Sequence, residues 1–275
     1  MPSAGRTLKV AAESVEGLGE IAWNLANPAP DLPLNVPIGS HRRFAWVPAD
    51  LEDLKVIKNR LGGTVNDVVL AVVTGALRGW LHGRGVRTEG LELRGLVPVS
   101  LRTEDERGEL GNKLAALRGP LPVYIEDPVK RLEAVRAEMG GVKESKQALG
   151  AGAIVMFNDF SPPTLLAQAS RLNFSTRLFN LIVTNVPGPQ IPLYVLGREL
   201  EHVFPVAFLP QDHALAIAIM SYNGRMDFGL LADYDSMPDV ELIGAGIEDE
   251  IAELRKAAEA GEPKAAEPEP AQPTA

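Results

Sequence analysis

Two polar residues, Asn66 and Asp67, stand at the start of an apolar stretch that runs from residue 65 to about residue 81. They follow a glycine pair and a threonine, Thr64. This spacing predicts a capping box, in which Thr64 caps a helix and the Asp67 carboxylate reaches back to the backbone N–H of the cap. Capping and burial account for both polar residues, and a role in a binding site is the alternative.

Histidine is the side chain best suited to general base chemistry near neutral pH, and the chain has four of them. They are His41, His82, His202 and His213, and none has a neighbouring histidine. His213 follows Asp212 at the head of an apolar strand, where Asp212 or Asp233 could in principle orient its ring. A lone histidine at a strand end is more often a hydrogen-bonded structural residue, so we assign it no catalytic role.

The composition excludes several classes of function. The 275 residues contain no cysteine, which rules out disulfides, thiolate catalysis and cysteine-ligated metal. A net charge of −9 and a pI near 5.1 argue against nucleic acid as a partner. No signal peptide is recognisable at the start, and no apolar run reaches the roughly 18 residues of a membrane span. We expect a cytoplasmic protein, with peripheral contact to a membrane or lipid body left open.

The elements that position these residues follow from periodicity, caps and turns. We predict helices over residues 8–25, 51–61, 65–81, 128–149, 151–160, 164–174 and 238–254, with Asp50 and Asp127 as caps. Strands are predicted over residues 41–47, 91–101 with a break at Pro98, 111–117, 178–184, 200–208, 214–222 and 225–234. Asn223-Gly224 predicts a type I′ hairpin between the last two.

This order of elements indicates an α/β fold, a mixed-sheet sandwich whose last strands form an antiparallel meander. Residues 1–37 combine an amphipathic helix with a proline-rich segment of the kind that links domains. Residues 38–260 form the main domain. Residues 261–275 are rich in Ala, Pro and Glu and are expected to be disordered.

Several short motifs follow one another from about residue 34 to residue 254. They are Thr64-Val65-Asn66-Asp67, Val97-Pro98-Val99-Ser100-Leu101-Arg102, Gly111-Asn112, Asp127-Pro128 with Arg131-Leu132, Thr184-Asn185-Val186-Pro187-Gly188-Pro189, Ser221-Tyr222-Asn223-Gly224, Asp227-Phe228-Gly229-Leu230, and Asp233 before Pro238-Asp239. In this order they resemble the carboxy-terminal half of the bacterial wax ester synthase/diacylglycerol acyltransferase family.

The resemblance implies one half of a chloramphenicol acetyltransferase-like, coenzyme A-dependent acyltransferase fold, in which two halves meet at a tunnel. The implied substrates are acyl-CoA and either diacylglycerol or a long-chain alcohol, with no cofactor. Asn66 and Asp67 resemble the family's Asn-Asp motif, and Asn185, Pro187 and Gly188 its Asn-Val-Pro motif. All five are expected to support the substrate tunnel. Arg42-Arg43 could grip a coenzyme A phosphate, although such a pair is more often a solvated strand edge.

The active site of the family is a His-His-x-x-x-Asp-Gly motif in the amino-terminal half, where the second histidine takes a proton from the alcohol. This sequence does not contain that motif. We therefore predict no catalytic residue and no metal ligand in this chain, and little or no turnover by the chain alone. Its expected partner is an amino-terminal acyltransferase half, or a second copy through an exposed apolar face.

Three interpretations remain open at this point. The chain is one half of an O-acyltransferase that a second chain completes, or a non-catalytic lipid-binding or regulatory homologue, or a fragment without independent function. The first is our prediction.

Overall fold

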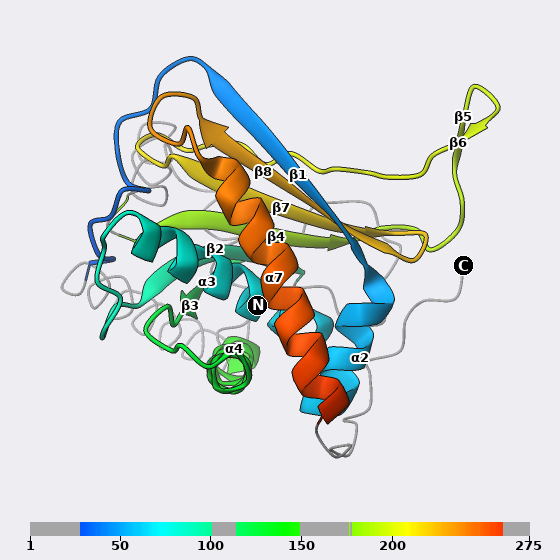
Figure 1. Cartoon of the computed structure of the whole chain (residues 1–275), viewed down its shortest axis with the longest axis horizontal. Helices are drawn as coiled ribbons and strands as arrows, with labels where there is room; N and C mark the ends of the chain where they lie inside the picture. Colours follow the sequence, from blue (N-terminus) through cyan, green and yellow to red (C-terminus); the bar gives the residue numbers. More distant parts are fainter. Residues whose placement is uncertain (1–27, 101–113, 149–175, 177, 261–275) are drawn as a thin grey trace, which may run out of the picture.

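The structure, a computed structural model, describes residues 28–100, 114–148, 176 and 178–260 (Figure 1). Its elements follow the chain as listed here: β1 (Arg42–Asp50), α2 (Leu51–Leu61), α3 (Val65–Gly83), β2 (Leu93–Ser100), β3 (Leu114–Leu121), α4 (Pro128–Ala148), β4 (Leu181–Pro187), β5 (Tyr194–Val195), β6 (Arg198–Glu199), β7 (Leu215–Tyr222), β8 (Arg225–Asp233) and α7 (Val240–Ala260). The predicted mixed α/β fold is confirmed.

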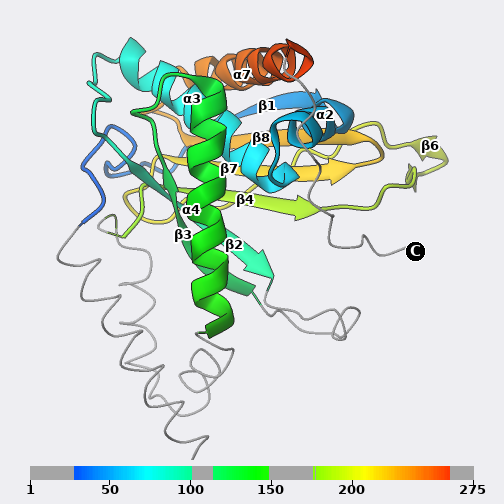
Figure 2. The same cartoon turned by 90° about the horizontal axis from the view of Figure 1, so that it is seen from below.

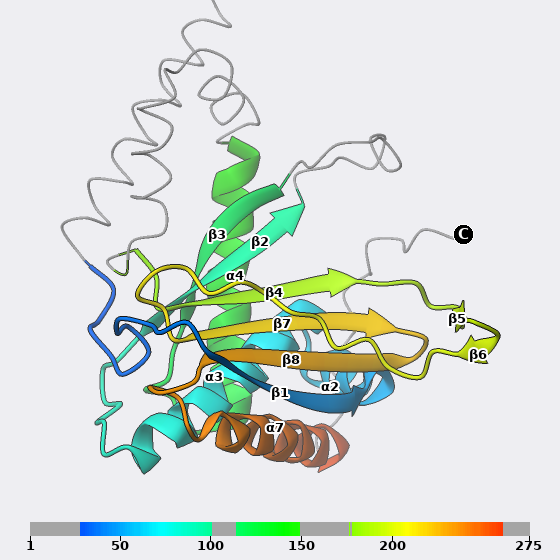
Figure 3. The ribbon, with the colours of Figure 1, turned by 90° about the horizontal axis from the view of Figure 1, so that it is seen from above.

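Six strands form one mixed sheet in the order β1-β8-β7-β4-β2-β3. β4 runs parallel to β7 and to β2, whereas the other neighbouring pairs are antiparallel. The four helices cover one face of this sheet, as the view from below shows (Figure 2). The opposite face carries no described helix (Figure 3). The described part of the chain therefore has two layers, one of helices and one formed by the sheet, and no described helix covers the second face of the sheet.

The helices begin where side-chain caps were predicted. The Asp50 carboxylate accepts a hydrogen bond from the backbone N–H of Glu52, and the Asp127 carboxylate accepts one from Lys130. Thr64 and Asp67 form the predicted capping box at the start of α3. Each cap satisfies an N–H group that the first turn of a helix leaves without a partner.

α3 is the central helix of the covered layer. Its residues from Asp67 to Leu77 are all buried, as expected for a helix that is apolar on every side. It packs against α4, α7 and α2, and α7 in turn packs on β1. α3 is thereby enclosed by the other helices of its layer.

One strand prediction is wrong, and another is wrong in part. Residues 200–208 form no strand. They form an irregular stretch, called here the crossing segment, that lies across the helix-free face of the sheet (Figure 3). They cannot add to the sheet beside β7 or β8, because both strands already have a neighbour on each side. β2 continues through Pro98 without a break. It pairs with β4 only at Gly95 and Leu96, so beyond them one side is unpaired, and proline is tolerated there.

The remaining strand and turn predictions agree with the structure. Asn223 and Gly224 have φ angles of 43° and 82°, as a type I′ hairpin between β7 and β8 requires. β3 is described over Leu114–Leu121 and ends four residues beyond the predicted end at residue 117, whereas residues 111–113 lie outside the described residues. The predicted helices at 8–25, 151–160 and 164–174 and the tail at 261–275 lie outside the described residues. The division into segments 1–37, 38–260 and 261–275 remains a prediction.

Candidate functional site

The start of α3 is a compact polar cluster. The backbone N–H of Thr64 donates to Asp67 Oδ2 over 2.8 Å, and the Thr64 hydroxyl donates to the same oxygen over 2.8 Å. The N–H of Asp67 donates to Thr64 Oγ1 over 3.3 Å. Asp67 is only 3% exposed, and its second oxygen, Oδ1, is buried without a hydrogen-bond partner among the described residues. Capping thus uses one carboxylate oxygen of Asp67 and leaves the other without a hydrogen-bond partner among the described residues.

The glycine pair before Thr64 allows the chain to turn into the helix. Gly62 and Gly63 both have φ of 90°, a conformation that residues with a Cβ rarely adopt. A Cβ on Gly62 would also lie 2.5 Å from Nη1 of Arg136. The backbone conformation therefore favours glycine at Gly62, whereas the flexible Arg136 side chain could move away from a Cβ.

The second motif meets the first at this point. Asn185, near the end of β4, donates from Nδ2 to Oδ1 of Asn66 over 3.3 Å, although 119 residues separate the two. Both side chains are half-buried. β4 lies between two parallel neighbours, and the carboxyl ends of parallel strands are where ligands commonly bind in α/β folds. The structure brings together Asn66, Asp67 and Asn185.

Pro187 is the last residue of β4, and Gly188 begins the turn that follows it. The N–H of Gly188 donates to the backbone oxygen of Ser221 over 2.9 Å, and a Cβ on Gly188 would lie 2.4 Å from that oxygen. Gln190 ties the turn to β7 by donating from Nε2 to Gly188 O and to Ser221 Oγ. Glycine is required at residue 188 because its backbone packs too closely against Ser221 to leave room for a Cβ. Tunnel support by Pro187 and Gly188 stays a prediction.

Three of the histidines contact groups other than carboxylates among the described residues. His213 is fully buried and stacks on Phe179, and its two ring nitrogens lie 2.8 Å and 3.2 Å from carbonyl oxygens of Gln211 and Phe179. Neither Asp212 nor Asp233 bonds to it among the described contacts. His82 Nε2 lies 2.6 Å from the Thr88 hydroxyl. His41 packs edge-on against Tyr234.

His202 is the histidine that the sequence did not single out. Its Nδ1 lies 2.9 Å from Oδ1 of Asp227, and the N–H of Val203 donates to Oδ2 of the same carboxylate over 2.8 Å. Within the described ranges this is the one histidine paired with a carboxylate. Asp227 is fully buried, so the two donors satisfy its charge and fasten the crossing segment to β8. The partners are 25 residues apart on different elements, which leaves no local spacing to reveal them.

The paired arginines both make contacts within the protein. Arg42 donates from Nη1 to the backbone oxygens of Gly39 and His41 and lies 3.6 Å from Asp233. Arg43 stacks on the Tyr234 ring and donates to the Tyr234 backbone oxygen. Both guanidinium groups are therefore engaged within the protein.

Shifted pKa values occur away from the Asn66–Asn185 contact. Burial raises the pKa of Glu250 above its usual 4.5, although the adjacent Arg131 opposes the shift. The pKa of Asp239 lies below its usual 3.8, because the hydrogen bonds from Arg84 and Trp80 and the charge of Arg84 together outweigh the opposing effect of burial. No group of three or more His, Cys, Asp or Glu side chains among the described residues could hold a metal ion.

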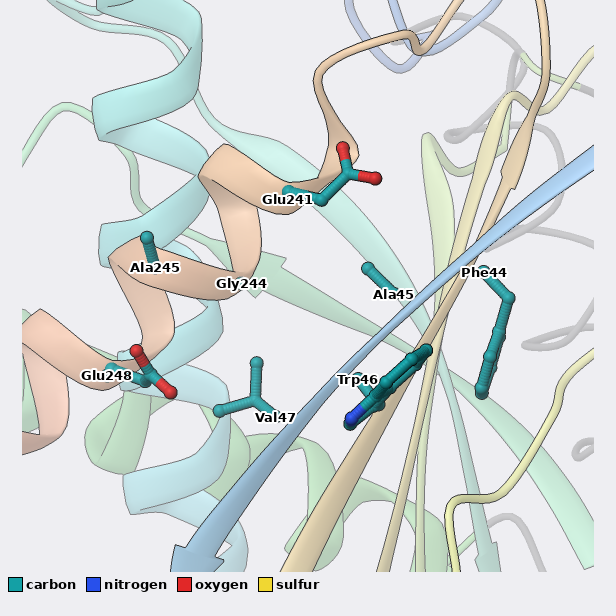
Figure 4. Close-up of a pocket in the computed structure, with 8 residues that line it drawn as sticks. All are labelled: Phe44, Ala45, Trp46, Val47, Glu241, Gly244, Ala245 and Glu248. Atoms are coloured by element: carbon teal, nitrogen blue, oxygen red, sulfur yellow. The ribbon is translucent and has the colours of Figure 1, made fainter.

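Two surface grooves lie elsewhere. One, of about 350 Å³, runs between the edge strand β1 and α7 (Figure 4), with Ala45 and Val47 on the helix side of β1 and Phe44 and Trp46 on the other. The second, of about 420 Å³, lies between α3 and α7. Neither is lined by Asn66, Asp67 or Asn185.

Solved structures identify the fold. The chain is similar to a wax ester synthase/diacylglycerol acyltransferase from Marinobacter aquaeolei, with a TM-score of 0.66, 24% identity, and coverage of 94% of this chain and 58% of that chain. It is also similar to a condensation domain that releases the chain from the enacyloxin polyketide synthase, with a TM-score of 0.54, 14% identity, and coverage of 97% and 51%. The class is thus the chloramphenicol acetyltransferase-like fold of acyltransferases and condensation domains.

Sequence comparison identifies the family. Residues 110–255 match the WS/DGAT C-terminal domain, and residues 2–69 match the wax ester synthase/diacylglycerol acyltransferase catalytic domain. A probable diacylglycerol O-acyltransferase of Mycobacterium tuberculosis, tgs1, is 32% identical over 243 residues, which are 88% of this chain and 52% of that protein. The chain belongs to the wax ester synthase/diacylglycerol acyltransferase family, as its motifs predicted. It spans about half the length of the curated relatives it matches.

Proposed function

We propose that this chain is the carboxy-terminal part of an acyl-CoA-dependent O-acyltransferase. The reaction moves a fatty acyl group from coenzyme A to diacylglycerol or a long-chain alcohol, which yields triacylglycerol or wax ester. One observation carries the proposal: the hydrogen bond from Asn185 to Asn66 joins two separate family motifs in one accessible polar cluster. Family membership and fold support the same activity.

The reaction needs a base that the described residues do not identify. The alcohol gives up its proton as its oxygen attacks the thioester carbon, and the coenzyme A thiolate leaves and takes a proton. His213 and His82 are engaged in hydrogen bonds, and His202 holds the crossing segment. We therefore assign the base to an amino-terminal acyltransferase half that carries the His-His-x-x-x-Asp-Gly motif. This chain would supply the tunnel wall that faces it.

An exposed apolar surface supports the need for a partner. The β5–β6 hairpin projects from the body of the molecule (Figure 1), and its tip residue Leu196 is fully exposed. Tyr194 and Val195 are 63% and 58% exposed. A two-stranded hairpin is marginally stable by itself, and apolar surface of this kind usually marks an interaction site. An amino-terminal half is the proposed occupant, and self-association is the competing one.

The function is tested by release of coenzyme A thiol from palmitoyl-CoA with diacylglycerol or a long-chain alcohol. Because the protein has no cysteine, a thiol-reactive dye gives no background from it. We expect little release by the chain alone and alcohol-dependent release after adding the amino-terminal half of a mycobacterial relative. Release by the chain alone would place the base in this chain. No release from either mixture would favour a lipid-binding homologue or a fragment.

Contact with a lipid surface is a further part of the proposal. Among the described residues, no single helix is long and apolar enough to cross a membrane. Diacylglycerol resides in membranes, so the enzyme must reach it at a surface. Flotation of the chain with vesicles that contain diacylglycerol tests this contact, and a chain that stays at the bottom of the gradient would contradict it.

A further inference from the structure

The Asn66–Asn185 pair leaves one donor and one acceptor open. Asn185 Nδ2 donates to Asn66 Oδ1, which fixes both amides. The amide Nδ2 of Asn66 and the amide oxygen of Asn185 then have no partner in the described part of the chain. Both side chains are half-buried rather than fully solvated. The pair therefore presents a donor beside an acceptor, which is the complement of a secondary amide.

Asp67 adds a second, independent sign of a missing ligand. Its Oδ1 is buried and accepts no hydrogen bond from the described residues. A buried acceptor without a donor costs about 1–3 kcal/mol, so such groups usually have a partner or a function. The capping box needs only Oδ2, and Oδ1 remains available to an N–H or O–H group of a ligand.

The charge at this point decides which ligand fits. The start of a helix favours an anion, such as a phosphate, because its free N–H groups carry partial positive charge. Here the Asp67 carboxylate already occupies that position and is almost fully buried. A second negative group would be repelled by it. A neutral ligand that both donates and accepts hydrogen bonds is therefore favoured over a phosphate or an oxyanion.

We propose that Asn66 and Asn185 bind an amide group in the pantetheine arm of acyl-CoA. Asn66 Nδ2 donates to the amide oxygen, and the amide N–H donates to the oxygen of Asn185. This inference rests on the proposed function, because that function makes acyl-CoA the donor substrate. It assigns to the two family motifs the recognition of the acyl carrier rather than of the acyl chain or the alcohol.

Binding, rather than turnover, is the direct test. Coenzyme A, pantetheine and adenosine 3′,5′-bisphosphate are each titrated into the full 275-residue chain and followed by ligand-observed NMR. The variant Asn66→Asp replaces the donor with an acceptor at constant size, and Asn185→Asp places a carboxylate against Asn66. Asn59→Asp makes the same change on an exposed turn of α2 and serves as the control. Circular dichroism confirms that each variant is folded.

We expect coenzyme A and pantetheine to bind and the bisphosphate, which lacks the amides, to bind more weakly. Asn66→Asp and Asn185→Asp should each weaken coenzyme A and pantetheine about five- to tenfold, and Asn59→Asp should not. Unchanged affinity in both site variants, preference for the bisphosphate, or no binding of pantetheine would overturn the inference.

The same variants separate this inference from the proposed function. Alcohol-dependent thiol release in the presence of an amino-terminal half, together with unchanged coenzyme A affinity in the variants, would overturn the amide site alone. Amide-dependent binding of coenzyme A without any thiol release would support the site and count against the transferase.

Discussion

The two faces of the sheet differ in how completely the described residues cover them. On one face, α2, α3, α4 and α7 bury a continuous core that includes most of the large apolar side chains. On the other, an irregular segment crosses the strands, and Val206 and Phe208 remain 64% and 61% exposed. Apolar surface of that size is rarely left to water. The helix-covered face holds the main core, and we propose that the other face meets a partner.

Removing a side chain from the covered face should have the largest effect. Phe228 on β8 is fully buried, so Phe228→Ala should lower the free energy of unfolding by about 3–5 kcal/mol through lost burial and a cavity. Phe208→Ala, on the open face, should change it by less than about 0.5 kcal/mol. Urea unfolding followed by circular dichroism measures both. Equal losses would mean that the open face is packed in solution.

A methyl group added between β8 and the crossing segment should have the next largest effect. A Cβ on Gly229 would lie 1.9 Å from the backbone oxygen of Pro205, which cannot move without shifting the segment. Gly229→Ala should therefore cost about 1–3 kcal/mol. Gly79→Ala, on an exposed turn of α3 with no atom within 4 Å, should stabilise by about 0.5–1 kcal/mol. A neutral Gly229→Ala would show that the segment does not rest on the sheet.

Acid should weaken the junction between β8 and the segment that precedes β1. Burial raises the pKa of Asp233, but hydrogen bonds from Ser236 and Gly39 outweigh it and lower the pKa below its usual 3.8. Because the folded-state pKa is the lower one, the stabilisation is present above pH 3.8 and is lost as the pH falls through the lowered pKa.

Asp233→Asn should cost about 1 kcal/mol at pH 7 and flatten the acid side of the stability curve. Urea midpoints between pH 2 and pH 7 measure this, with the exposed Asp249→Asn as control. An unchanged slope in Asp233→Asn would assign the acid sensitivity to other carboxylates.

Local signals predicted the covered face well. Asp50, Thr64 and Asp127 cap their helices because a cap depends on residues within one turn. The Asn223-Gly224 turn follows from the two residues that form it. The same reasoning failed for residues 200–208, whose apolar residues suit a strand. Their position is set instead by Asp227, a side chain on another element, and by the absence of a free sheet edge.

The candidate site was predictable only in part. The sequence placed Asn66 and Asp67 at a helix start and Asn185 near a strand end, which the structure confirms. It could not place Asn185 against Asn66, because no periodicity relates residues 119 positions apart. The sequence also could not predict the unpartnered Asp67 oxygen, because a capping-box pattern does not say which carboxylate oxygen stays without a hydrogen bond. Family resemblance supplied the functional class, and geometry supplied the contact.

The smallest effect on stability should come from the β5–β6 hairpin, where the effect on association should be clear. Leu196 is fully exposed at a φ of 52°, a conformation that asparagine adopts more readily than leucine. Leu196→Asn should thus change the free energy of unfolding by less than about 0.5 kcal/mol while reducing self-association in light scattering. Leu242→Asn, at a leucine 63% exposed on α7, is the matched control and should leave association unchanged. A wild-type chain that is cleanly monomeric would contradict self-association through the hairpin. A Leu196→Asn chain that associates as strongly as the wild type would leave the crossing segment as the main part of the associating surface.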